Sequence, residues 1–216
     1  MTTAEVWRTT DRLLPLGEAA DGAWIAEQAV QELLLTAAQG VRGVVPARPR
    51  FRLAEPGPDA GIPVPPGGLP PGDLRVSLEF AAVTGRPLPQ LASRLRVALL
   101  DAAEGTLGLS VAEVNLRITD LLDAPPDSPP PVPPPGRTSP PTPDDPAALA
   151  ALAVPGVAAL TDAFGAPVVR TPTGLRVEVA VTKDHHPLTV TRALRTAVTA
   201  AAPEATTVTV VVSELR

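Results

Sequence analysis

The side chains best suited to chemistry in this sequence are its only two histidines, His185 and His186, which directly follow Asp184. Imidazole and carboxylate groups transfer protons and bind metal ions, so these three residues are the candidate enzyme site. Adjacent histidines on an extended chain point to opposite faces and rarely bind one metal together. We therefore favour a solvated turn over a metal or proton-transfer site.

Other patterns typical of catalysis are missing from the sequence. Glu178 and Asp184 are a conceivable carboxylate pair, but nothing brings them together, and we interpret them as surface charges. The only lysine, Lys183, has no glycine-rich phosphate loop before it. The glycines that we considered are interpreted as turn residues: Gly67, Gly68, Gly105 and Gly108. We predict that the chain is not an enzyme and has no catalytic residue, cofactor or metal.

Composition narrows the remaining function classes. The sequence has 216 residues, a net charge of −5 and 2% aromatic residues, which disfavours binding to the phosphate backbone of nucleic acids. It has no cysteine, which fits a cytoplasmic protein and excludes disulfides. The strong preference for arginine over lysine, with many Ala, Pro and Val residues, is typical of a GC-rich, actinobacterial genome.

The chain termini and apolar runs predict no membrane insertion. Charged residues such as Glu5 and Arg8 interrupt the beginning of the sequence, which is unlike a signal peptide. The longest uncharged run, Pro146 to Thr161, is shorter than the about 20 apolar residues of a spanning helix. We expect a cytoplasmic location.

Periodicity predicts a first α/β repeat over residues 21–122, after an N-terminal segment, 1–20. Helix formers favour a helix over Ala23–Gln39, which Gly40 ends. Strict alternation over Leu74–Ala82 predicts a half-buried strand. The other predicted parts are a short strand at Phe51–Ala54, a Pro/Gly-rich insertion at 55–73, a helix over Pro89–Ala103 and a strand over Val111–Thr119.

A proline-rich linker, residues 123–146, separates this repeat from a second one at 147–216. Twelve prolines favour an extended, semi-rigid spacer in the linker. Leu74-Arg75-Val76 matches Leu175-Arg176-Val177, and Pro87-Leu88 matches Pro187-Leu188. The predicted fold class is α+β: two small two-layer repeats, each helix-strand-strand-helix-strand, related by internal duplication and packed as a pseudo-dimer.

Three further residues are candidate contacts with a partner or the core. Asn115 lies on the polar face of a predicted strand, and we favour an exposed or edge position over an interaction contact. Trp24, at the beginning of the first predicted helix, is expected in the core. Trp7 is either a docking anchor or a residue without a binding role.

The stretch from Leu74 to Leu122 ends in a distinctive motif. A helix leads through Leu107-Gly108-Leu109 into Val111-Ala112-Glu113-Val114-Asn115-Leu116. This resembles the alkaline-shock, envelope-stress-response protein family of Gram-positive bacteria, in which a Thr-Gly-Leu step precedes a strand reading Val-x-x-Val-Asn-Val. The junctions Gly40-Val41 and Pro155-Gly156-Val157 resemble the helix-to-strand junction of the same family. The insertion, the linker and the duplication differ from its single-domain members, so we expect a divergent two-domain relative.

The resemblance implies a non-enzymatic scaffold that acts by protein–protein interaction in cell-envelope homeostasis. Its implied partners are other members of the family and a membrane-embedded anchor protein, which would place the chain beneath the membrane, and it implies self-association. No site residue carries over from the family. The alternative is a small RNA-binding α/β module, which would need a basic loop that the sequence does not have.

Overall fold

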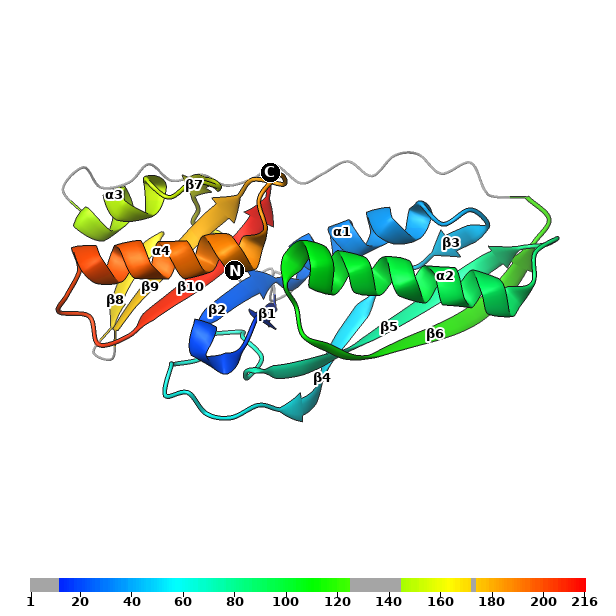
Figure 1. Cartoon of the computed structure of the whole chain (residues 1–216), viewed down its shortest axis with the longest axis horizontal. Helices are drawn as coiled ribbons and strands as arrows, with labels where there is room; N and C mark the ends of the chain where they lie inside the picture. Colours follow the sequence, from blue (N-terminus) through cyan, green and yellow to red (C-terminus); the bar gives the residue numbers. More distant parts are fainter. Residues whose placement is uncertain (1–11, 125–144, 172–173) are drawn as a thin grey trace, which may run out of the picture.

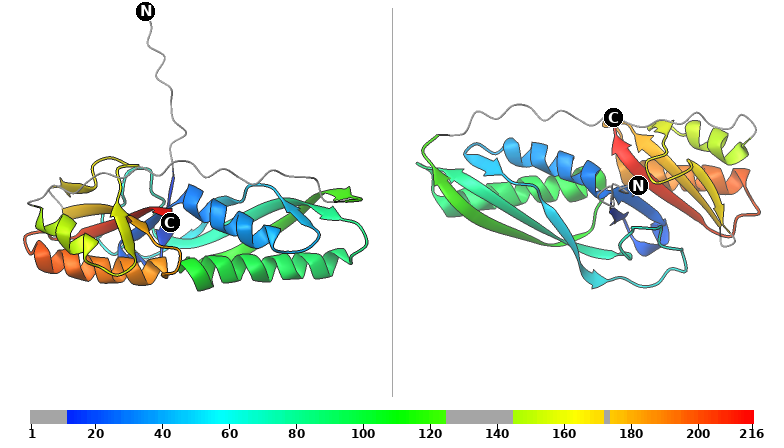
Figure 2. Two further views of the ribbon diagram at one scale, coloured as in Figure 1. Left: turned by 90° about the horizontal axis from the view of Figure 1, so that it is seen from above. Right: turned by 180° about the vertical axis from the view of Figure 1, so that it is seen from behind.

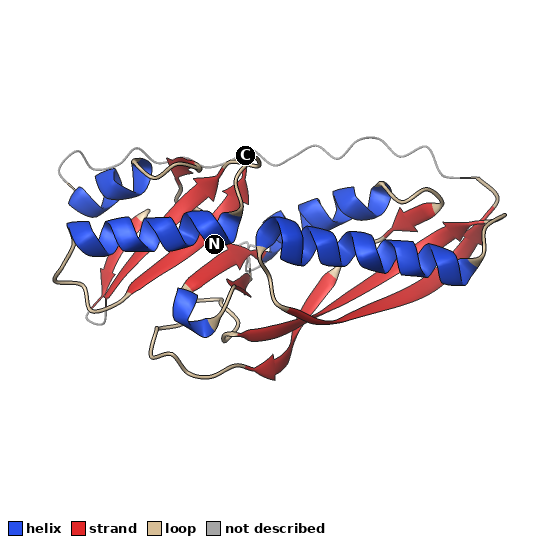
Figure 3. Cartoon of the chain, in the orientation of Figure 1, coloured by secondary structure: helices blue, strands red, loops and turns tan. Residues whose placement is uncertain are grey.

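A computed structural model describes residues 12–124, 145–171 and 174–216 as an α+β protein with two sheets, each covered by helices on one face (Figures 1 and 3). Trp7 and nearly all of the predicted linker lie outside the described residues. None of the described helices is long and apolar enough to cross a membrane.

The first unit, as described, contains two α-helices, one π-helix and four strands. In chain order these are α1 (Glu27–Gln39), β3 (Val44–Pro46), β4 (Arg50–Pro56), β5 (Gly72–Val83), α2 (Leu88–Leu100), the π-helix η2 (Asp101–Leu107) and β6 (Val111–Leu122). Strands β3 and β4 pair antiparallel with opposite ends of β5, while β6 pairs with β5 in parallel. The predicted insertion is the connection of the β4–β5 hairpin, in which Pro56 pairs with Gly72.

The second unit repeats this order and this pairing. Its elements are α3 (Pro146–Leu152), β7 (Val157–Leu160), β8 (Val168–Thr171), β9 (Gly174–Val181), α4 (Pro187–Ala201) and β10 (Val208–Leu215). Strands β7 and β8 pair antiparallel with β9, and β10 pairs with it in parallel. The matching triplets occupy the same place, because Leu74 pairs with Val111 and Leu175 pairs with Val208. Descent of both units from one ancestral sequence stays a prediction.

Each unit has one short strand more than the sequence predicted. Strands β3 and β7 directly follow the first helix of each unit, and they lengthen the order to helix-strand-strand-strand-helix-strand. The second helix of the first unit also differs from its prediction. It continues past Gly105 as η2, and Gly108, whose φ is 85°, ends it.

The largest departure concerns the residues before α1. We predicted a helix over Ala23–Gln39, but Ala23–Ala26 is strand β2, and α1 begins at Glu27. Strand β1 (Leu13–Leu16) pairs antiparallel with β2, and the 3₁₀ helix η1 (Ala19–Asp21) connects them. Strand β2 pairs in parallel with β10, so this hairpin belongs to the sheet of the second unit.

The hairpin joins the two units into one hydrophobic core, which contains buried residues of both sheets. Trp24 is 1% exposed in this core, as predicted, although it lies in a strand. Helices α4 and α2 lie end to end along one side of the molecule (Figure 2, left). Where they meet, the Gly17 amide donates a hydrogen bond to the Gly108 carbonyl (3.1 Å).

Candidate interaction surface

The histidine turn lies between β9 and α4, and its two rings have different neighbours. His185 Nδ1 lies 2.9 Å from Thr182 Oγ1 and 3.1 Å from Asp184 Oδ1. His186 Nδ1 lies 3.5 Å from Thr189 Oγ1. Within the described ranges, no three His, Cys, Asp or Glu side chains gather in a way that could hold a metal ion. The turn therefore provides no shared ligand geometry for the two histidines.

Glu178 is buried, so its interpretation as a surface charge is wrong. Its side chain is 0% exposed in the middle of β9. Glu178 Oε1 accepts hydrogen bonds from Thr161 Oγ1 (2.9 Å) and the Ala163 amide (2.7 Å), and Oε2 accepts one from the Phe164 amide (3.0 Å). Burial raises the pKa of Glu178 above its ordinary value, and these donors offset only part of that effect.

The burial of Glu178 belongs to a strand that is covered on both faces. From Val177 to Val181, consecutive residues of β9 are all buried. The segment between β7 and β8 folds over the face away from the helices, where Arg176 donates a hydrogen bond to the Phe164 carbonyl (3.1 Å). The hydrogen bonds of Glu178 thus hold this segment against the sheet. Asp184 is not near Glu178 in this arrangement, because it lies in the exposed turn after β9.

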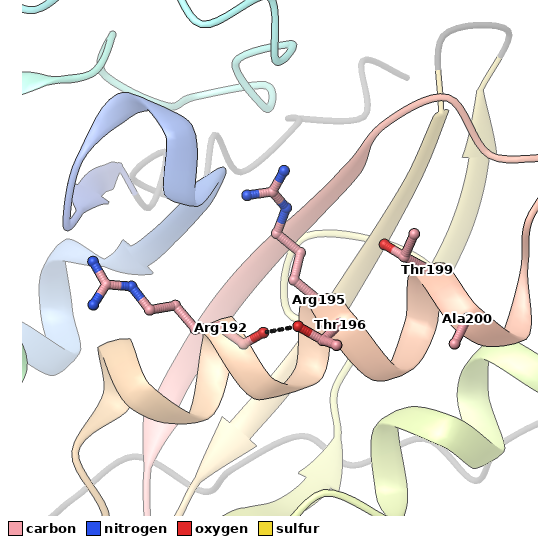
Figure 4. Close-up of a pocket in the computed structure, with 5 residues that line it drawn as sticks. All are labelled: Arg192, Arg195, Thr196, Thr199 and Ala200. Carbon is pink, nitrogen blue, oxygen red and sulfur yellow. Dashed lines mark hydrogen bonds between the residues drawn. The ribbon is translucent and has the colours of Figure 1, made fainter.

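A shallow hollow of about 540 Å³ lies on α4 and is lined by Arg192, Arg195, Thr196, Thr199 and Ala200 (Figure 4). Arg192 donates two hydrogen bonds to Asp21, with Nε 2.7 Å from Oδ1 and an Nη 2.9 Å from Oδ2. Arg195 donates to the Ala20 carbonyl. Both guanidinium groups therefore bind η1 to α4. We interpret the residues of the hollow as a structural contact between these two helices and not as a ligand site.

The pKa of Asp21 is lowered by its contact with Arg192. Partial burial raises its pKa, but the hydrogen bonds from Arg192 and from the Glu18 amide outweigh burial and lower it below the ordinary value. The carboxylate is thus ionised when it holds the arginine.

Strand β6 is the outer strand of its sheet and the strongest candidate for a functional surface. It is 12 residues long, and among the described residues only β5 pairs with it. Most of its residues are exposed, including Asn115, which confirms the predicted exposed or edge position. An unpaired strand of this length presents a row of backbone donors and acceptors that another strand can bind.

Two apolar side chains near the end of β6 are exposed although they lie on the helix-covered face. Ile118 pairs with Phe80 and Leu121 pairs with Ala82, and both of these β5 partners are buried. Ile118 is 36% exposed and Leu121 is 55% exposed. The predicted strand, Val111–Thr119, includes Ile118 but ends before Leu121. Leu121-Leu122, an apolar pair just before the proline-rich linker, was the available signal.

Comparison of the chain with protein families, curated proteins and solved structures finds no match.

The other sheet edges of the described residues are capped or interrupted. At β1, the Leu13 amide donates to the Gly67 carbonyl (3.0 Å), and the Leu69 amide donates to the Leu13 carbonyl (2.9 Å), so the insertion covers that edge. The opposite edge of each sheet consists of two short strands, β3 with β4 and β7 with β8, with irregular residues between them. A long, continuous, unpaired edge is therefore a property of β6.

Proposed function

We propose that this chain is a non-enzymatic, two-unit scaffold of the cell-envelope stress response, which binds other modules of its class and a membrane-embedded anchor protein. Its binding surface is the edge of β6, with the exposed side chains of Asn115, Ile118 and Leu121. Through the anchor, the chain would act at the cytoplasmic side of the membrane.

The observation that carries the proposal is the position of the family-like motif on the free edge. The residues from Val111 to Leu116 that resemble the envelope-stress family form the first half of β6. Because the other sheet edges of the described residues are covered or broken, an accessible strand with exposed apolar residues is suited to strand addition. The hydrophobic residues at Ile118 and Leu121 would supply contact area, and the backbone would supply orientation.

The proposal is tested by deleting the gene in the bacterium that encodes it and measuring growth at alkaline pH and with cell-wall antibiotics. The wild-type gene should restore growth, and a gene with Ile118→Glu and Leu121→Glu should not. Val97→Glu is the matched control, because Val97 is 67% exposed and lies on α2, outside β6. Thermal unfolding of the purified variants checks that each one folds.

Two results would contradict the proposal. The first is a deletion strain that grows like the parent under envelope stress. The second is a doubly substituted chain that folds and restores growth as fully as the Val97→Glu control does. A photocrosslinker at Asn115 should capture a membrane-embedded protein or a related module in cells, and its absence from all such adducts would also count against the proposal.

A further inference from the structure

We propose that β6 pairs antiparallel with β6 of a second copy of this chain, with Glu113 of each copy opposite Arg117 of the other. This rests on the surface assigned under the proposed function and names one occupant for it. The pairing would join the two four-stranded sheets into one continuous sheet about a two-fold axis at Asn115.

The helix-free face of β6 has a regular charge pattern. Glu113, Asn115 and Arg117 alternate along this face. Within the chain, Glu113 Oε2 lies 2.6 Å from Arg75 Nε, and Arg117 has an Nη 3.7 Å from Glu79 Oε1. Each strand of the pair β5–β6 therefore carries one positive and one negative residue, in opposite order.

Antiparallel pairing centred on Asn115 extends this pattern without placing like charges together. Glu113 would face Arg117 of the second copy, and the row across four strands would read Arg75, Glu113, Arg117 and Glu79, with alternating sign. A two-fold axis generates this row twice. Pairings centred on Glu113 or on Arg117 would instead place two like charges opposite each other, which destabilises cross-strand contacts.

The same register matches the apolar face. Residues two apart share a face of a strand, so Val114 would lie opposite Leu116 of the second copy on the helix-covered side. Val114 is 8% exposed, and Leu116 is partly exposed. The register therefore places polar residues against polar ones and apolar against apolar.

The regular part of β6 fits the required length. The pairing of β6 with β5 shifts at Ala112 and at Thr119, where an extra residue interrupts the ladder, and it is continuous from Glu113 to Ile118. Bulges of this kind end regular pairing. The uninterrupted stretch thus includes the five residues from Glu113 to Arg117 that the two-fold pairing would use.

The second unit of the chain shows that this place in the fold accepts a further strand. Strand β10 corresponds to β6, and its outer edge is occupied by β2. There the added strand, β2, is parallel to β10 and comes from the same chain. At β6, the opposite charges of Glu113 and Arg117 favour antiparallel pairing with β6 of a second copy.

The proposal is tested with the purified full chain by sedimentation over a range of concentrations. The wild type should form dimers reversibly. Glu113→Arg and Arg117→Glu should each weaken dimerisation by about tenfold or more, because each places like charges at two symmetric contacts. An equimolar mixture of the two variants should recover dimers. In the mixed dimer one chain has arginine at both positions and the other has glutamate at both, so each contact again joins opposite charges.

The matched controls are Glu32→Arg and Arg42→Glu, which make the same charge changes at exposed positions of α1 and of the turn before β3. They should dimerise like the wild type, and their mixture should behave like its components. A wild type that stays monomeric at every concentration overturns the pairing, which includes the case where residues 125–144 cover the edge. A dimer that the β6 variants do not weaken, or whose variants do not complement each other, also overturns it.

The two proposals fail separately. A monomeric wild type together with a growth defect of the β6 variants would leave the envelope function standing with another partner. A complementing pair of variants in a strain without any stress defect would leave the pairing standing and remove the function.

Discussion

Strands β6 and β10 occupy the same place in their units, yet their surroundings differ. Strand β10 has β9 on one side and β2 on the other, and its first five residues are buried. Strand β6 has only β5 beside it among the described residues, and one of its residues, Val114, is buried. The same topology thus yields a central strand in one unit and an edge strand in the other.

The comparison shows that the segments packed against each sheet, more than the fold of its unit, decide which of its edges and faces are exposed. The second sheet is completed from outside its own unit by the β1–β2 hairpin, and its helix-free face is covered by the segment fastened to Glu178. Among the described residues, the first sheet has neither addition. We expect the buried second sheet to contribute more to stability, and the exposed edge of the first sheet is the surface to which we assign partner binding.

Removing a buried side chain of β2, the strand added to the second sheet, should have the largest effect on the free energy of unfolding. Trp24→Ala is expected to lower the free energy of unfolding by about 3–5 kcal/mol, because it empties a buried aromatic site and removes the hydrogen bond from Trp24 Nε1 to the Leu69 carbonyl (2.9 Å). Leu121→Ala on β6 should change it by less than about 0.5 kcal/mol. Urea unfolding measures both, and equal losses would contradict the contrast between the two strands.

Substitution of Glu178 tests the covered face of the second sheet. Glu178→Ala should lower the free energy of unfolding by about 1.5–3 kcal/mol at neutral pH, because the amides of Ala163 and Phe164 lose their acceptor. Ser77 occupies the corresponding place in β5 and is partly exposed, so Ser77→Ala should have little effect. A loss at Ser77 as large as that at Glu178 would show that both faces are covered alike.

The raised pKa of Glu178 predicts that stability depends on pH. Its pKa in the folded chain is raised above the ordinary value of 4.5, so the unfolded chain releases this proton first as pH rises. The stability gained from protonated Glu178 is therefore full below pH 4.5 and is lost as pH rises through the folded-state pKa, whereas the hydrogen bonds from the Ala163 and Phe164 amides remain at neutral pH. Urea unfolding measures the free energy of unfolding of the wild type and of Glu178→Gln across this range. The wild type should lose stability relative to the variant as pH rises, and the loss should then level off. A difference between the two that stays constant with pH would refute the raised pKa.

The junction between the units gives the smallest expected effect. Gly108 has φ 85°, and an added Cβ would lie 2.7 Å from His186 Cε1 and 2.7 Å from Leu188 Cβ. Gly85 has φ 90° with open space around it. Gly108→Ala should therefore cost about 1–3 kcal/mol more than Gly85→Ala, since both share the backbone strain and only one crowds the junction. Equal losses in thermal unfolding would mean that the units are not tightly packed there.

Much of each unit could be predicted from the sequence. The alternation in Leu74–Ala82 and the helical spacing after Pro89 depend on local burial, which repeats with the period of the element. The Pro/Gly-rich composition of residues 55–73 predicted an insertion between two strands, and the core position of Trp24 followed from its residue type. The exposed position of Asn115 followed from its place on the polar face of a strand.

The missed features depend on contacts between distant residues. Ala23–Ala26 runs into good helix formers without a glycine or proline, and all four residues are buried, so no alternation marks the strand. Its partner, Val210–Val212, lies near the other end of the sequence. Glu178 likewise alternates like a surface residue, and only the segment at Thr161–Phe164 buries it. Single-sequence periodicity contains no information about such partners.

The pairing of β2 with β10 has a consequence for the order in which the chain folds. Helix α1 and strands β3 to β6 can assemble as soon as they are synthesised, but β2 is made before them and must wait for β10, which follows every other described element. Pairings so distant in sequence close slowly, because a long loop loses much conformational entropy. The early chain therefore exposes Trp24 and Ile25 beside a finished first unit, and insertion of this strand is the step at which both units become one cooperative structure.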